Sequence, residues 1–138
     1  MMPFSRVPLQ QVVGAAIDRL VHWVERGTPP PTATPLELTP EGTKVRDDLG
    51  LARGGIRLSQ VVASTALNTG DDAGESFCRL FGTHVPFDEA TLDSLYPSRG
   101  RYVLDVAATD LRNLRAGYIT AADARDNLAD ALRADVGR

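Results

Sequence analysis

Residues 9–26 read LQQVVGAAIDRLVHWVER, and this stretch decides the fold because it predicts one long helix. Apolar side chains recur at the spacing of one helical face: Val13, Ile17, Leu20 and Val24. Polar side chains fall on the opposite side. This apolar stripe is wider than a lone surface helix needs. We therefore expect these four residues to form an interface with a substantial partner surface.

The next part of the chain predicts little regular structure. Gly27 supplies a helix stop, and four prolines within residues 29–35 prevent a regular continuation. We expect residues 28–76 to be extended or irregular, with short strands near residues 36–38 and within residues 58–67. Such a long stretch of weak structure is unusual in a self-contained domain, and it indicates a segment that lies across a larger body.

Helical signals return near the C-terminus, where three predicted helices fill residues 88–134. Asp88 is a helix cap before the first of them, and the second begins near Arg99, after Ser98, which has the character of a helix cap. Thr120 with Asp123 has the pattern of a capping box at the start of the third. The fold class expected from these elements is mainly α with a little β.

The length and composition of the chain limit the classes of protein to which it can belong. The 138 residues suit a single segment, and 43% hydrophobic with 24% charged residues is ordinary globular composition. The net charge of −3 argues against nucleic acid as a partner. We find neither a signal-peptide pattern nor an apolar run long enough for a membrane span, so we expect a soluble, cytoplasmic protein with no membrane partner.

No motif supplies a self-sufficient active site. A serine hydrolase would carry its nucleophile in a G-x-S-x-G turn, and that pattern is absent from this sequence. Cys78 and His84 could form a nucleophilic pair, but the apolar neighbours of Cys78 favour a buried structural thiol. His22 falls on the polar side of the first helix and reads as a solvated side chain. We therefore predict no catalytic residue.

Acidic pairs occur in two places, at Asp47 with Asp48 and at Asp71 with Asp72. They could hold a cation loosely, but solvated acidic loops are the simpler interpretation. With two histidines and one cysteine, no metal-ligand spacing is present. We predict neither a metal nor a cofactor.

The stretch from Arg53 to Arg57 reads RGGIR. Its paired glycines permit a turn or a close backbone approach, and the two guanidinium groups could flank a bound anion. A structural turn with arginine–carboxylate pairs is the favoured interpretation. If the chain is a binding module, the candidate ligand-binding residues are these two arginines together with aromatic side chains: Arg53, Arg57, Phe81 and Phe87, with Phe77 nearby.

Three blocks taken together resemble a known family. They are residues 20–30 (LVHWVERGTPP), 51–57 (LARGGIR) and 78–97 (CRLFGTHVPFDEATLDSLYP). Their order and spacing are similar to the C-terminal segment of bacterial α/β-hydrolase domain proteins, which are mostly predicted esterases. In that family a helix ends in W-V-x-x-G-T-x-P-P, an R-G-G-[IV]-R turn follows, and a phenylalanine–glycine loop leads to a Y-P motif. The resemblance spans roughly Leu9 to Leu132.

This resemblance implies a truncated, hydrolase-like segment without the central sheet. A full family member has a catalytic sheet, a serine elbow, an acid and a histidine upstream of the matched part, and no position here corresponds to them. Where the family continues the R-G-G turn with a proline and an acidic residue, this chain has Leu58–Val62, LSQVV. The apolar stripe of the first helix would pack on the catalytic sheet, and residues 28–76 would wrap over it.

Two functions follow from these observations. The first is a carboxyl-ester-hydrolase-like segment that is non-catalytic alone or belongs to a split hydrolase. Its partner would be a catalytic subunit or a second copy, bound through the first helix. The alternative is a stand-alone small helical module for ligand binding or protein interaction.

Overall fold

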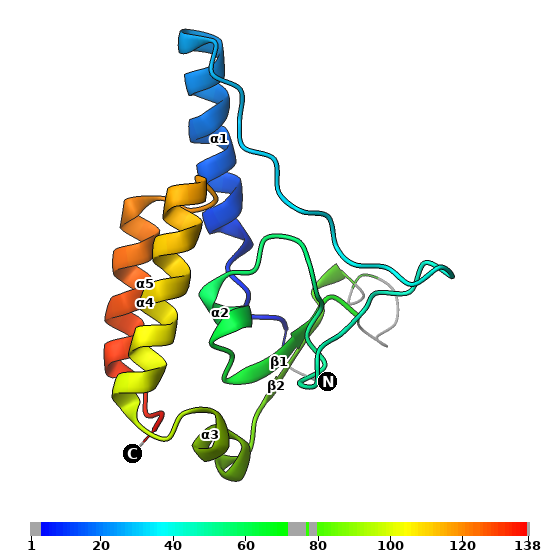
Figure 1. Ribbon diagram of the computed structural model, residues 1–138, viewed down its shortest axis with the longest axis vertical. Helices are drawn as coiled ribbons and strands as arrows, with labels where there is room; N and C mark the ends of the chain where they lie inside the picture. Colours follow the sequence, from blue (N-terminus) through cyan, green and yellow to red (C-terminus); the bar gives the residue numbers. More distant parts are fainter. Residues whose placement is uncertain (1–3, 72–76, 78–79, 138) are drawn as a thin grey trace.

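The computed structural model describes residues 4–71, 77 and 80–137 (Figure 1). Its elements, in chain order, are α1 (Leu9–Arg26), α2 (Ser59–Val62), β1 (Ala66–Thr69), β2 (Thr83–Pro86), α3 (Glu89–Leu95), α4 (Arg99–Ala116) and α5 (Ala121–Arg133). Among the described residues the one sheet is the antiparallel pair β1–β2. The prediction of a mainly α chain with a little β and no central sheet is confirmed.

Helix α1 has the bounds that its periodicity predicts. Gly27 ends it in the left-handed conformation, with φ of 70°, and the Gly27 N–H donates to the Trp23 carbonyl. Arg26 lies in the last turn, where its positive charge suits the helix dipole. In Figure 1 the C-terminal half of α1 extends beyond the ends of α4 and α5. A large part of the helix is therefore outside the main helix contacts.

The segment after α1 is extended, as expected, and returns along the helix. The Tyr118 hydroxyl donates to the Thr32 carbonyl at 3.1 Å. The Arg19 guanidinium lies against Gly117 at the C-terminal end of α4, where a Cβ on Gly117 would be 2.8 Å from Arg19 Nε. A cation at this position also suits the negative end of the α4 dipole. These contacts hold one flank of α1.

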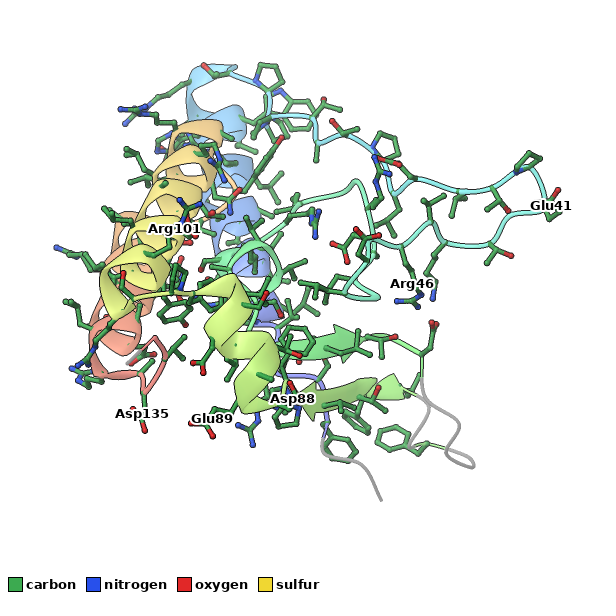
Figure 2. The ribbon with its side chains drawn as sticks, turned by 60° about the horizontal axis from the view of Figure 1, so that its bottom comes forward. Glu41, Arg46, Asp88, Glu89, Arg101 and Asp135 are labelled. Atoms are coloured by element: carbon green, nitrogen blue, oxygen red, sulfur yellow. The ribbon has the colours of Figure 1, made fainter. Side chains whose placement is uncertain are left out.

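Residues 28–58 contain no helix or strand. The short strand expected at residues 36–38 is instead part of a set of isolated antiparallel bridges, which join Leu36 to Gly54, Leu38 to Lys44 and Arg46 to Ala52. Gly54 has φ of 73°, and a Cβ there would lie 2.4 Å from the Pro35 carbonyl oxygen. The paired glycines therefore serve a close backbone approach. Figure 2 shows Glu41 at the tip of this segment, far from α4 and α5.

The strand predicted within residues 58–67 is wrong for residues 59–62. These form the one-turn helix α2, whose backbone N–H groups bond back to the Leu58 carbonyl. The strand begins only at Ala66, after Ser64, whose hydroxyl donates to the Ala66 carbonyl. β-Branched side chains favour a strand by propensity, but tertiary context decides such short stretches.

Each C-terminal helix begins at the cap that the sequence predicts. Side chains of Asp88, Ser98 and Thr120 accept backbone N–H groups at the starts of α3, α4 and α5. Asp123 completes a capping box with Thr120. Local sequence therefore fixes where these helices start, and contacts between them fix how they pack.

The apolar core is small. Ala63, Val106 and Ala131 form its buried centre, with Tyr102 and Val103 packed against it. Outside it, about as many buried side chains are polar or charged as are apolar, and the polar ones are Gln11, Ser59, Ser64, His84, Thr109, Asp110, Asn113 and Asn127. Because buried polar groups need partners, hydrogen bonds between distant segments carry much of the tertiary structure.

Two of these side chains, Gln11 and Asn127, form with the half-buried Gln60 what we call the amide bridge. Gln11 Nε2 donates to Asn127 Oδ1 at 2.8 Å, and Asn127 Nδ2 donates back to Gln11 Oε1 at 3.2 Å. Gln60 Nε2 also donates to Asn127 Oδ1, at 3.0 Å. The amide bridge thus joins α1, α2 and α5.

The amide bridge can be tested by two neighbouring substitutions on α1. Gln11→Ala leaves the Asn127 amide without its α1 partner, so the free energy of unfolding should fall by about 1–3 kcal/mol. Gln10→Ala is the matched control, because Gln10 is exposed, and its effect should stay within about 0.5 kcal/mol. Urea unfolding followed by circular dichroism measures both. Equal effects of the two substitutions would refute a structural role for the bridge.

Candidate functional site

The four predicted interface residues all lie on the outer surface of α1. Their exposed fractions are 48% for Val13, 59% for Ile17, 52% for Leu20 and 80% for Val24. We call this set the apolar face of α1. Side chains of this type usually become buried in folded proteins. Their exposure leaves this face available to a partner, and the interface itself stays a prediction.

The side of this helix opposite the apolar face is the one turned inward. Gln11 and Ala15 are its buried residues, and Gln11 belongs to the amide bridge. Because successive helical residues turn by about 100°, Gln11 points nearly opposite to Val13, and Ala15 nearly opposite to Ile17. In most amphipathic helices the apolar side faces the core. Within this chain the apolar face of α1 is turned outward instead.

The two arginines of the ligand-binding set form ion pairs in the irregular segment. Arg53 Nε lies 3.3 Å from Glu37 Oε2, and Arg57 donates to Asp47 Oδ2 at 2.8 Å. The Arg57 carbonyl also accepts from Asn113 Nδ2 at 3.0 Å. This agrees with the favoured interpretation of a structural turn with arginine–carboxylate pairs.

The aromatic members lie in two other places. Phe81 packs against Phe4, with ring centroids 4.7 Å apart, and against Phe77 at 5.2 Å. Phe87, past the other end of β2, lines the groove described below. The four predicted ligand-binding residues thus belong to three separate sets of contacts, and ligand binding by them stays a prediction.

The remaining candidates from the sequence are the cysteine and the acidic pairs. Cys78 and Asp72 lie outside the described residues. Asp71 pairs with Lys44 and Arg46, and the hydrogen bond from Lys44 lowers the pKa of this carboxyl despite a small opposing effect of burial. In the part of the chain that the structure describes, no group of three or more His, Cys, Asp or Glu side chains could hold a metal ion.

A large groove lies where the elements converge, and we call it the central groove. Its volume is about 890 Å³, and every helix and both strands of the described structure contribute to its lining. Three carboxylates of α5, Asp123, Asp126 and Asp130, line it together with Tyr102 and Phe87. A cavity of this size is in the range of small-molecule sites.

His84 lines the central groove in one defined protonation state. Its Nδ1 lies 2.9 Å from Asn68 Oδ1, and the same oxygen accepts the Arg6 backbone N–H at 3.1 Å. Since an amide oxygen only accepts, Nδ1 carries the proton and Nε2 is left as an acceptor. Burial, with the nearby positive charge of Arg6, lowers the pKa of His84, so the ring is neutral at pH 7.

Asp110 on α4 is buried beside Ser59 and Asn127 and is not among the residues that line the central groove. Its residue is 1% exposed, and neither carboxyl oxygen has a hydrogen-bond partner among the described residues. Burial raises the pKa of Asp110, and the negative charge of Asp123 adds to the rise. The adjacent Ser59 and Asn127 side chains oppose it, but they direct hydrogen bonds elsewhere, to side-chain oxygens of the amide bridge.

Asp110 carries a signal in the sequence that belongs to no motif. Asp110 lies four residues after Val106 and seven after Val103, so it occupies the apolar stripe of its own helix. A carboxylate at such a position is buried, because the stripe faces the core. Its lack of a partner depends on side chains far away in the chain, and no local pattern reveals that.

Asp110 should make stability depend on pH. The native protein holds this proton more tightly than the unfolded chain does, so ionisation costs stability as the pH rises above the ordinary value of 3.8. Asp110→Asn should therefore gain stability relative to wild type between pH 4 and pH 7. Urea unfolding at both pH values measures the difference, with the exposed Asp48→Asn as the control for one lost charge. A stability difference between Asp110→Asn and wild type that is the same at both pH values would contradict the prediction.

No described helix is long and apolar enough to cross a bilayer.

Comparison with known proteins identifies a family for this chain. No curated protein and no solved structure matches the chain. The family described as "Alpha/beta hydrolase domain" matches residues 1–129, which is nearly the whole sequence. The family resemblance inferred from the three motif blocks is thereby confirmed, and this chain belongs to the alpha/beta hydrolase domain family.

Proposed function

We propose that this chain is a hydrolase segment that is non-catalytic alone and docks through the apolar face of α1 onto a hydrolase catalytic part. That part supplies the nucleophile, the acid and the histidine of a carboxyl-ester hydrolase. The family match supports the choice of partner. The proposal places the protein in the cytoplasm, where a single cysteine stays reduced.

The reversed orientation of α1 is the observation that carries the proposal. On its inner side Gln11 belongs to the amide bridge, and no element among the described residues covers the apolar face. Further exposed apolar side chains widen the surface, with Leu9 at 68% and Trp23 at 49%. Each such side chain contributes about 1.5–3 kcal/mol when it becomes fully buried. A contiguous surface of this kind marks an interaction site.

The sheet of an α/β-hydrolase is a suitable partner for this face. Parallel sheets are covered on both sides by helices, so a helix with a broad apolar stripe is the element that such a sheet needs. The chain itself holds no G-x-S-x-G turn, so the nucleophile has to come from the partner. This division of roles accounts for both the exposed face and the missing motif.

Complementation in trans tests the proposal. A family member from which the region corresponding to this chain has been deleted should regain hydrolysis of p-nitrophenyl butyrate when this chain is added. The double variant Ile17→Asp/Val24→Asp should abolish the gain, because it places two charges in the docked surface. Both positions are exposed, so the stability of the free chain should change by less than about 1 kcal/mol.

The conservative double variant Ile17→Val/Val24→Ile is the matched control, and it should restore activity as wild type does. The chain alone should show no hydrolysis. Activity of the chain alone that is blocked by a serine-directed fluorophosphonate would disprove the non-catalytic assignment. Full complementation by the double Asp variant would disprove docking through α1. Sedimentation of the free chain as a dimer that the Asp variant dissociates would replace the catalytic partner with a second copy.

The aromatic residues favour one alternative, a stand-alone interaction module. Phe4 and Phe77 remain 46% and 68% exposed although both pack on Phe81. This second candidate predicts a partner whose binding is lost in Phe81→Ala and kept in the double Asp variant of α1. Binding measurements with both variants therefore separate the two functions.

A further inference from the structure

A second cavity lies between α1, the proline-rich segment that follows it and the turn that joins α4 to α5. Its volume is about 100 Å³, and none of its lining residues lines the central groove. We call it the proline pocket, after Pro30 and Pro31 in its wall. We propose that the proline pocket binds a short-chain carboxylate, with the apolar stem inside the pocket and the carboxyl group on Arg19.

Helix α1 contributes three residues to the proline pocket: Val12, Ala16 and Arg19. They are four and three residues apart, so they lie on one side of the helix. None of them belongs to the apolar face of α1. The pocket and the proposed docking surface therefore use different side chains of the same helix.

The walls of the pocket suit an apolar stem. Apart from Arg19, Gly117 and Tyr118, the lining residues are all apolar: Val12, Ala16, Pro30, Pro31, Ala33 and Ile56. The Tyr118 hydroxyl donates to the Thr32 carbonyl at 3.1 Å, and this bond holds the proline-rich segment in place. An apolar cavity of ~150 Å³ accepts a molecule as large as benzene. The smaller proline pocket therefore suits a stem of about three to five carbons.

Arg19 is the charged residue of the pocket, and it has no anionic partner in the described structure. Three of the described arginines are half-buried: Arg19, Arg46 and Arg57. Arg46 and Arg57 pair with the carboxylates of Asp71 and Asp47. Among the described residues, Arg19 forms neither an ion pair nor a hydrogen bond. Because a half-buried guanidinium has lost part of its hydration, a carboxylate that enters the pocket offsets a cost that is already present.

The charged end of Arg19 lies at the pocket wall. Gly117 lines the pocket, and a Cβ at this residue would be 2.8 Å from Arg19 Nε and 2.9 Å from Arg19 Nη2. The C-terminal end of α4 carries roughly half a negative charge, which leaves part of the guanidinium charge uncompensated. A guanidinium binds a carboxylate through two parallel hydrogen bonds, so it selects this group over a hydroxyl or an ammonium group.

Short-chain carboxylates are also the acid products of carboxyl-ester hydrolysis. This connection with a reaction rests on the function proposed above, whereas binding to the free chain does not. A chain that binds the acid but fails to complement a hydrolase would keep this inference and refute the proposed function. A chain that complements but does not bind the acid would do the opposite.

Three probes with the same four-carbon stem test the charge requirement: butyrate, 1-butanol and butylammonium. NMR titration of the ¹⁵N-labelled full chain at constant ionic strength should show saturable shifts of the Gly117 and Tyr118 amides with butyrate. Butyrate should bind at least tenfold more tightly than 1-butanol, and butylammonium should not bind. Octanoate should bind no more tightly than butyrate, because the pocket has no room for the longer stem. Equal affinity for butyrate and 1-butanol, or no saturable shift with butyrate, would overturn the proposal.

Arg19→Gln is the decisive variant, because it removes the charge and keeps a polar side chain. Since Arg19 has no ion pair to lose, the chain should stay folded, and circular dichroism checks this. The affinity for butyrate should fall at least tenfold, while the weak affinity for 1-butanol stays unchanged. Arg26→Gln is the matched control, since Arg26 is exposed on the same helix and does not line the pocket. An unchanged preference for butyrate in Arg19→Gln would refute the proposal.

A second variant fills the pocket without changing its charge. Ala16 is exposed, so Ala16→Leu should fold normally while the larger side chain takes up part of the pocket volume. The affinities for butyrate and 1-butanol should then fall together, by about tenfold. Ala16→Ser keeps a small side chain and should bind both probes as wild type does. If Ala16→Leu binds butyrate as tightly as wild type, the ligand lies elsewhere and the proposal fails.

Discussion

The hydrogen bonds of Asn127 with Gln11 and Gln60 determine which way α1 faces. The Gln11 and Asn127 amides bond reciprocally across 116 residues, and Gln60 adds a third helix to the same oxygen. A buried amide that loses its partner costs more than an ordinary hydrogen bond contributes, so this contact is strongly selective for one rotation of α1. The outward position of the apolar side chains is a direct consequence.

Hydrogen bonds between buried polar side chains also align the other helices. The apolar centre consists of a few small side chains, so specific hydrogen bonds are needed to align the helices. Asp110 is one exception, because neither of its carboxyl oxygens has a hydrogen-bond partner among the described residues, and Arg57 Nε is another. Burial raises the pKa of Asp110, so its ionised form should cost stability, and groups with such raised pKa values are common at functional sites.

Local patterns were enough to predict the long helices. The bounds of α1 follow from its periodicity and Gly27, and the starts of α3, α4 and α5 follow from Asp88, Ser98 and Thr120. The strand expected at residues 59–62 was wrong because α2 depends on its surroundings more than on β-propensity. The central groove could not be predicted from the sequence for a related reason. Its walls come from segments as far apart in the chain as Arg6 and Ala134, and which side chains meet there depends on the packing of α1 against α5.

The contacts that flank α1 have a consequence for the speed of association. The Tyr118 hydroxyl holds Thr32, and Arg19 lies over Gly117, so α1 is fixed on one flank as well as on its inner side. The partner that we propose would then meet a helix that is already formed and already oriented, and little ordering would remain to be done on contact. Docking of such a preformed surface is limited by diffusion and orientation, not by a slow rearrangement. Stopped-flow mixing should accordingly give a single phase whose rate rises linearly with partner concentration.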